Sequence, residues 1–182
     1  MIVLGIGPGL TGAIAAICGQ RGLLDLMDIP VCDNGHASGS MRNWVDVATL
    51  VLQLRDWSNR FEFASHGQLL AAMERPIPMP RLPSQTIASQ FDTVGAIRAT
   101  LICRASAVQM VEPGRWKKRY GLKADKDDSR ACAQRIYPSA TQWLARKKDH
   151  NRAEAVLIGD WLLQEHDGAR ESRALEWARS EE

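Results

Sequence analysis

The chain has 182 residues, of which 45% are hydrophobic and 24% charged, and its formal net charge is +2. This length suffices for one compact domain with a sizeable core, and the composition is typical of a soluble globular protein. The small net charge does not by itself indicate a nucleic-acid partner. No apolar run is long enough to cross a bilayer, and the first residues lack a basic leader with a cleavage site. We therefore expect a cytoplasmic protein with no membrane association.

The first part of the chain predicts three strands. Ile2 to Ile6 and Leu10 to Cys18 are apolar runs, and Leu23 to Ile29 alternates apolar with acidic residues. Short glycine-rich turns join them, which is typical of an antiparallel meander. A loop rich in Gly, Ser and Asn follows from Asp33 to Ser40.

The rest of the chain alternates predicted helices and strands. Apolar spacing and the residues that start or end helices predict these elements. The predicted strands are Gln68 to Glu74 and Ala107 to Val111. The predicted helices are Val45 to Trp57, Thr86 to Arg104, one that opens at Pro113, Asp127 to Ile136, and His150 to Gln164. A meander followed by alternating elements predicts an α/β fold, in which a mixed five-stranded sheet carries helices on both faces. That order is typical of a ribonuclease H-like domain.

Four stretches of the sequence together resemble one family. LGIGPGLTGAIA and LLAAMERP resemble the two catalytic strands of the RuvC-type Holliday junction resolvases. EPGRWKKRYGLKADKDDSRACAQRIYP and KKDHNRAEAVLIG are similar to the phage-borne and plant-chloroplast branch of that family. The resemblance covers most of Met1 to Leu163, so we expect one resolvase domain over residues 1–166 and a charged tail over 167–182. An actin-like or sugar-kinase fragment would predict a second phosphate loop and a second domain, and the sequence shows neither.

The resemblance implies metal-dependent, paired cleavage of four-way DNA junctions, with two Mg²⁺ or Mn²⁺ ions in each active site. Such chemistry needs carboxylates that converge on cations about 3.5–4 Å apart. Mg²⁺ prefers oxygen ligands and keeps several waters, so a few carboxylates suffice. Glu74 fits this role because it ends an apolar strand just before the break at Arg75-Pro76. Taken alone, Glu74 fits equally well as a surface charge that caps an edge strand.

The last predicted helix offers further metal ligands near its start. His150 and Glu154 lie about 40° apart around a helix and share a face, whereas Asp149 and Glu154 lie about 140° apart. We therefore expect His150 and Glu154 to form the site pair, with His150 as a metal ligand or general base. Asp149 ranks behind them as a ligand and is expected to be the N-cap. Asn151 is a weaker third candidate, and His150 remains open to interpretation as an exposed first-turn residue.

Gly7 stands where the family pattern has its first catalytic Asp. Gly removes the carboxylate without disturbing the turn at Gly7-Pro8-Gly9, so the chain is expected to be deficient in cleavage. Three explanations stay open: an engineered or selected loss of activity that keeps DNA binding, a natural junction-binding protein that does not cut, or a tight turn with no lost function. An Asp at this position is expected to point into an open cleft.

Basic residues cluster in the second half of the chain, and the match to a lysine-bearing loop of the family favours a DNA-binding surface. The candidates are Arg115, Trp116, Lys117, Lys118, Arg119, Lys123, Lys126, Lys147 and Lys148. The cations suit phosphate contacts, and the interleaved aromatic rings suit stacking on an unpaired base. The alternative is a solvated basic face without a partner.

Paired cuts in two strands imply a two-fold homodimer. The apolar residues Phe91, Val94, Ile97 and Leu101 recur at helical spacing in the Thr86 to Arg104 segment, which makes this helix the candidate interface. The same spacing is equally typical of packing in the core. A structure-selective DNA-binding protein without nuclease activity is the alternative function, and it requires the same fold and the same ligand.

Overall fold

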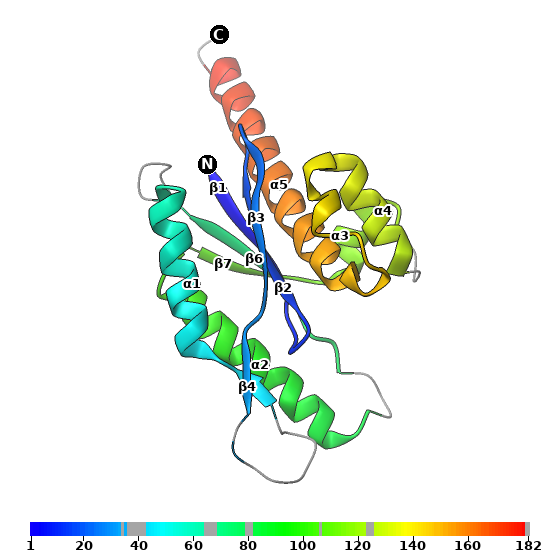
Figure 1. Cartoon of the computed structure of the whole chain (residues 1–182). Helices are drawn as coiled ribbons and strands as arrows, with labels where there is room; N and C mark the ends of the chain where they lie inside the picture. The colour runs from blue at the N-terminus through cyan, green and yellow to red at the C-terminus, as the bar shows by residue number, and fades with distance from the viewer. Residues whose placement is uncertain are drawn as a thin grey trace.

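The computed structural model describes residues 1–33, 35, 43–63, 69–78, 82–105, 107–122 and 126–180. Of Lys126 and of residues 169–180 it describes the backbone only. Its centre is a five-stranded sheet with helices packed on both faces (Figure 1). This confirms the predicted α/β architecture.

The sheet has the strand order β3-β2-β1-β6-β7. Its strands are β1 (Ile2–Gly7), β2 (Ala13–Cys18), β3 (Gly22–Asp28), β6 (Leu70–Glu74) and β7 (Ala107–Val111). The first three pair antiparallel, as the meander predicts, whereas β6 and β7 continue the sheet parallel to β1. Two short strands that the sequence analysis missed, β4 (Val31–Asp33) and β5 (Asn43–Val45), form a separate ribbon.

The helices divide between the two faces of the sheet. Helices α1 (Val47–Arg60) and α2 (Ser84–Ile102) cover one face, while α3 (Pro113–Arg119), α4 (Lys126–Ile136) and α5 (His150–Ser180) lie on the other. Alternation along β1 supplies both cores: Leu4 and Ile6 contribute to the core under α1 and α2, and Val3 to the core under α5. Within the described part of the chain, no helix is both long and apolar enough to cross a membrane.

Helix α5 differs most from its prediction. It continues to Ser180 instead of ending near Gln164, so the expected tail begins within a continuous helix. It is preceded by two short 3₁₀ turns, Pro138–Gln142 and Lys147–Asp149, which the apolar spacing did not reveal.

A buried carboxylate joins α5 to the elements beside it. Asp160 is 5% exposed and accepts hydrogen bonds from the hydroxyls of Tyr120 at 2.6 Å and Tyr137 at 2.7 Å. Burial, followed by these contacts with Asp160, raises the pKa of both tyrosines, so the hydroxyls remain donors. These bonds hold the ends of α3 and α4 against the middle of α5.

Strand β1 and helix α5 cross at unusually short range, which is possible because both carry glycine at the crossing. A Cβ atom on Gly5 would lie 2.2 Å from the Ala155 carbonyl oxygen and 2.2 Å from the Gly159 nitrogen. A Cβ on Gly159 would in turn lie 3.2 Å from the Gly5 nitrogen. The crossing therefore fixes the first turns of α5 over the carboxyl end of β1, where Gly7 lies.

Candidate active site

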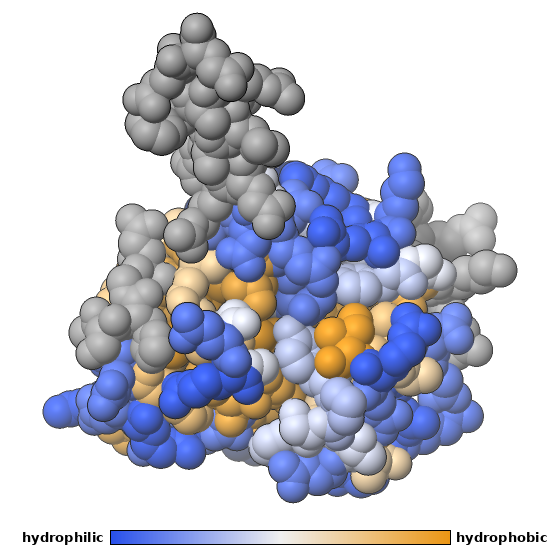
Figure 2. All heavy atoms as spheres, turned by 90° about the horizontal axis from the view of Figure 1, so that it is seen from above, coloured by the Kyte–Doolittle hydropathy of each residue, from blue (hydrophilic) through white to orange (hydrophobic). Residues whose placement is uncertain are grey.

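The candidate site lies at the carboxyl ends of the parallel strands β1 and β6, a common place for ligands in α/β sheets. A small pocket of about 120 Å³ opens there, lined by Gly7, Pro8, Gly9, Thr11, Gly12, Glu74, Asn151 and Glu154. Figure 2 views the molecule from above, where apolar patches alternate with hydrophilic side chains. The structure thus brings together four of the candidate site positions: Gly7, Glu74, Glu154 and the weaker candidate Asn151.

Glu74 ends β6, which lies between β1 and β7, so the interpretation of Glu74 as the cap of an edge strand is wrong. Its Oε2 atom accepts a hydrogen bond of 2.8 Å from the Trp116 indole nitrogen. Burial raises the pKa of Glu74, and the nearby charge of Glu154 adds to this, while the bond from Trp116 and the charge of Lys117 oppose it. The folded protein therefore holds a proton on Glu74 more tightly than an exposed carboxylate would.

Glu154 is held by a lysine from α3. The Lys117 ammonium lies 3.0 Å from Glu154 Oε1, and the two side chains are 30% and 19% exposed. The same ammonium stands 5.0 Å from the centroid of the Trp116 ring. Helix α3 thus contacts both carboxylates of the pocket, Glu74 through Trp116 and Glu154 through Lys117.

Gly7 faces the backbone of α5 more closely than we expected. A Cβ atom there would lie 3.3 Å from the Asn151 carbonyl oxygen and 3.9 Å from the Ala155 nitrogen. The expectation of an open cleft is therefore wrong for the first side-chain atom, although a shift of a few tenths of an ångström would relieve the contact. Beyond the Cβ, an Asp side chain would meet the pocket that Gly7 lines.

The structure places Asn151, not His150, beside Glu154 in the pocket. Asn151 and Glu154 lie three residues apart, about 60° around the helix, and so also share a face. The Asn151 amide donates to the Thr11 carbonyl oxygen at 2.8 Å and to the Thr11 hydroxyl at 3.0 Å. The predicted His150–Glu154 pair is thus replaced by an Asn151–Glu154 pair.

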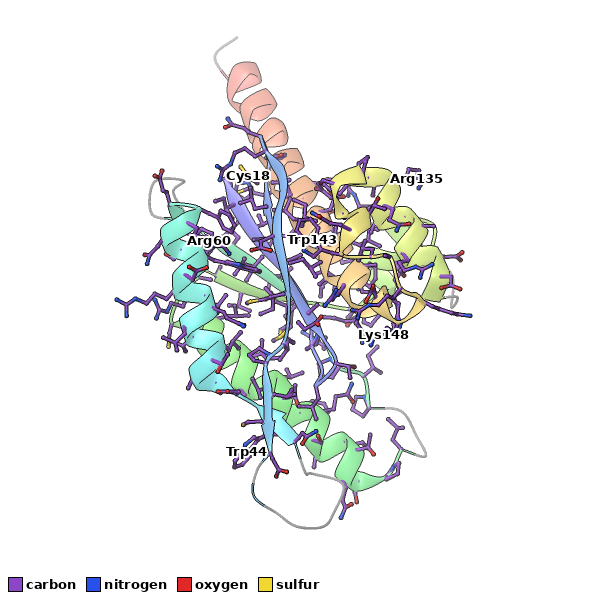
Figure 3. The ribbon with its side chains drawn as sticks, in the orientation of Figure 1. Cys18, Trp44, Arg60, Arg135, Trp143 and Lys148 are labelled. Atoms are coloured by element: carbon purple, nitrogen blue, oxygen red, sulfur yellow. The ribbon has the colours of Figure 1, made fainter. Side chains whose placement is uncertain are left out.

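His150 instead lines a larger neighbouring groove of about 750 Å³. The groove is bordered by Leu10, Thr11, Asp28, Ile29, Val31, Arg146, Lys148, Asp149, His150, Asn151 and Arg152. It shares Thr11 and Asn151 with the small pocket, so the two hollows lie side by side. Figure 3 shows Lys148 near the base of α5, on the border of this groove.

Asp149 caps the 3₁₀ turn that precedes α5. Its Oδ2 accepts the Arg146 backbone N–H at 2.8 Å, and its Oδ1 accepts from the Arg146 guanidinium at 2.8 Å. The residue is 3% exposed, and although burial opposes the shift, the contacts with Arg146 lower the pKa of Asp149. We expected Asp149 to cap α5, but it caps this 3₁₀ turn instead. Its carboxylate binds Arg146 and does not line the small pocket.

The predicted basic surface is only partly available to a ligand. Trp116 is 0% exposed, so the prediction that it stacks on a base is wrong. Its ring lies in the core, and its indole N–H donates a hydrogen bond to Glu74. Arg115 and Arg119 both form ion pairs with Glu165 on α5. Exposed cations remain at Lys118 and Lys148, whereas the exposed Lys147 ammonium lies 3.9 Å from the Asp127 carboxylate. Lys123 and the side chain of Lys126 lie outside the described residues.

The donors of the pocket do not fit a two-metal centre. Such a centre needs several converging carboxylates. Among the described residues, no group of three or more His, Cys, Asp or Glu side chains is arranged to hold a metal ion. The pocket offers Glu74, Glu154 and the Asn151 amide, with one carboxylate bonded to an indole and the other to an ammonium. Gly7 supplies no ligand atom from its side chain.

A central meander continued by parallel strands, in a sheet covered by helices on both faces, gives an α/β fold of the ribonuclease H-like kind. Within that class, its fold is similar to that of RuvC. "T. thermophilus RuvC in complex with Holliday junction substrate" superposes with a TM-score of 0.54 and 18% sequence identity, over 87% of this chain and 90% of that one. "Thermus thermophilus RuvC structure" gives 0.51 and 18%, over 87% and 91%. No family model and no curated protein matches the sequence.

The buried charge of Glu74 gives a testable dependence of stability on pH. Because its pKa in the folded protein is raised, folding loses stability as the pH rises above the ordinary value of 4.5. We expect Glu74→Gln, which keeps an oxygen for the Trp116 N–H, to melt at a higher temperature than the unmodified chain at pH 8. The difference should shrink towards pH 4 in thermal scans followed by circular dichroism. A lower melting temperature for the variant at pH 8 would contradict this.

Proposed function

We propose that this chain is a structure-selective endonuclease of the RuvC type, which resolves four-way DNA junctions and is deficient in cleavage because Gly7 stands in place of a catalytic Asp. The observation that carries the proposal is the convergence of Glu74 and Glu154 beside Gly7 at the ends of β1 and β6, on a fold similar to RuvC. The first of the two similar RuvC structures is a complex with a Holliday junction substrate. Assignment to the phage and plant-chloroplast branch rests on the sequence motifs.

The reaction of an intact centre would be paired phosphodiester hydrolysis with Mg²⁺ or Mn²⁺. Glu74 and Glu154 would be its carboxylate ligands, and the position of Gly7 would supply the third. In the chain as it stands, Trp116 and Lys117 occupy oxygens of both glutamates. The residues present therefore support binding of a strand near the pocket and do not support its cleavage.

A non-cleaving junction-binding protein is the second candidate function. The ion pair between Lys117 and Glu154 favours it, since that pair already neutralises a carboxylate that a nuclease would use for a cation. Either function would act on DNA in the cytoplasm of a bacterial or phage-infected cell, in association with the nucleoid. The two candidates differ in whether restoring one carboxylate restores cleavage.

The groove beside the pocket is the proposed path of the DNA backbone. Lys148 and Arg146 border it, and it adjoins the pocket at Thr11 and Asn151. We expect tighter binding of a four-way junction than of linear duplex with the same sequence, and a steep loss of affinity with salt because phosphate contacts release counterions. Competition binding with labelled junction at several salt concentrations measures both.

Two charge-matched variants test the location of this path. Lys148→Ala should weaken junction binding and lower the slope of log affinity against log salt by about 1, as expected for one lost phosphate contact. Arg55→Ala removes an exposed cation from α1, on the other face of the sheet, and should leave both quantities unchanged. Equal affinity for junction and duplex would refute the proposed function, and equal effects of the two variants would refute the path.

A homodimer through α2 remains part of the proposal. Three of the four apolar residues of α2 pack in the core, as the second interpretation of their spacing predicted: Val94, Ile97 and Leu101. The fourth, Phe91, is 44% exposed and could contact a partner. We expect sedimentation to show a dimer at micromolar concentration, and Phe91→Asp to shift it towards monomer because a charge would enter the apolar contact. A monomer alone, both with and without DNA, would remove this prediction.

A further inference from the structure

The pocket holds a cation of its own. Lys117 reaches from α3 to Glu154, and the ammonium stands 3.0 Å from Glu154 Oε1. With Glu74 and Glu154 ionised, Lys117 leaves the group with a net charge of about −1. Divalent ions are held in proteins by several oxygen ligands whose combined charge offsets their own. In its charges, this pocket therefore resembles a complete cluster of ion pairs more than a metal site that awaits its ion.

The Lys117 contact is not a loose surface pair. Both of its side chains are mostly buried, at 30% and 19% exposed, so solvent screens the attraction less than on an open surface. The Lys117 ammonium also stands over the Trp116 ring, 5.0 Å from its centroid. Trp116 itself is fully buried and bonded to Glu74, which fixes the helix that carries Lys117.

We propose that Lys117 takes the place of a divalent cation in this pocket, and that it excludes such cations from the chain as it stands. Because the Lys117 ammonium is part of the chain, its effective concentration at Glu154 is high, and it loses no translational freedom on binding as an ion from solution would. A divalent ion entering the pocket must displace it, leaving the ammonium without its carboxylate and in repulsion with the ion. Mg²⁺ must in addition give up tightly held waters for only two carboxylates.

Gly7 and Lys117 are then two parts of one adaptation. Removal of a carboxylate at position 7 lowers the negative charge of the pocket by one, and Lys117 offsets one of the charges that remain. The inference rests on the proposed function only in treating this pocket as the former cleavage centre. It does not depend on DNA binding, so an experiment can contradict this inference without contradicting the proposed function, and the reverse.

Manganese binding without DNA tests the inference, with electron paramagnetic resonance of free Mn²⁺ as the readout. We expect the unmodified chain to show little saturable binding, and Lys117→Met to bind Mn²⁺ at least about tenfold more tightly, because it removes the competing charge. Met keeps the length and apolar character of the lysine stem without its charge. Gly7→Asp should strengthen Mn²⁺ binding as well, and the double variant should bind most tightly.

Lys118→Met is the matched control, because it removes the same charge from the exposed neighbouring position of α3. It should change Mn²⁺ affinity by less than about twofold, as expected for a solvent-screened charge. Equal effects of Lys117→Met and Lys118→Met would overturn the inference, as would tight Mn²⁺ binding by the unmodified chain. If Lys117→Met fails to fold by circular dichroism, Lys117→Gln provides the same comparison. Junction competition on the same samples reports separately on the proposed function.

Discussion

Gly7→Asp is expected to produce Mg²⁺-dependent paired nicks near the branch point of a synthetic four-way junction. The rate should exceed that of the unmodified chain by at least about a hundredfold, the usual cost of losing one group that stabilises a transition state. The added carboxylate would join Glu74 and Glu154 in the pocket and provide the missing ligand. Junction affinity should change far less, because that group acts mainly in the transition state. Nicking assays with end-labelled strands measure the effect.

Gly7→Ala is the control for this experiment, because it adds the same Cβ atom, 3.3 Å from the Asn151 carbonyl oxygen, without a carboxylate. It should fold, bind junctions and remain inactive. Adding Glu74→Gln or Glu154→Gln to Gly7→Asp should abolish the nicks again. If Gly7→Asp folds and binds junctions yet remains inert with both Mg²⁺ and Mn²⁺, the assignment of this pocket as a resolvase centre is wrong. Full activity of the unmodified chain would contradict the role given to Gly7.

Gly5→Ala is expected to abolish folding or to lower the free energy of unfolding by more than about 4 kcal/mol. The new Cβ atom would lie 2.2 Å from backbone atoms of α5, which no side-chain rotation can relieve. Strand β1 and α5 would have to separate, and the core under α5 would lose contacts. Urea unfolding followed by tryptophan fluorescence measures the loss.

Gly95→Ala is the matched substitution, because a Cβ atom at that position in α2 meets no atom within 4 Å. It should stabilise the protein by about 0.5–1 kcal/mol, the usual difference between Ala and Gly inside a helix. A Gly5→Ala variant with the same urea midpoint as the unmodified chain would show that β1 and α5 do not cross as closely as described.

The sheet and the location of the site could be predicted from the sequence because local signals sufficed. Apolar runs between glycine-rich turns marked the meander, and Glu74 stood at the end of a strand before a proline break. Gly7 and Glu74 end strands that are neighbours and parallel, and this pairing brought them to one edge of the sheet. The short ribbon of β4 and β5 was missed because three residues carry too little periodicity.

The composition of the site could not be predicted to the same degree. The choice between His150 and Asn151 depends on the position and rotation of the first helical turn, and one residue along a helix changes direction by about 100°. Trp116 lies among four cations in sequence, which suggested exposure, yet α3 turns this one side chain into the core. The pairing of Lys117 with Glu154 depends on tertiary packing, and nothing in the spacing of the two residues along the chain indicates it.

The crossing of β1 and α5 also has a consequence for how the protein acquires its ligand site during synthesis. Gly5 and Gly159 meet although most of the chain lies between them, and long-range contacts of this kind slow folding because a long loop must close first. Until α5 has left the ribosome and docked, β1 and β6 can pair, but Asn151 and Glu154 are missing from the pocket. A chain in which α5 has not docked therefore lacks two of the side chains that line the pocket, and we expect the proposed binding of branched DNA to begin only after α5 has docked.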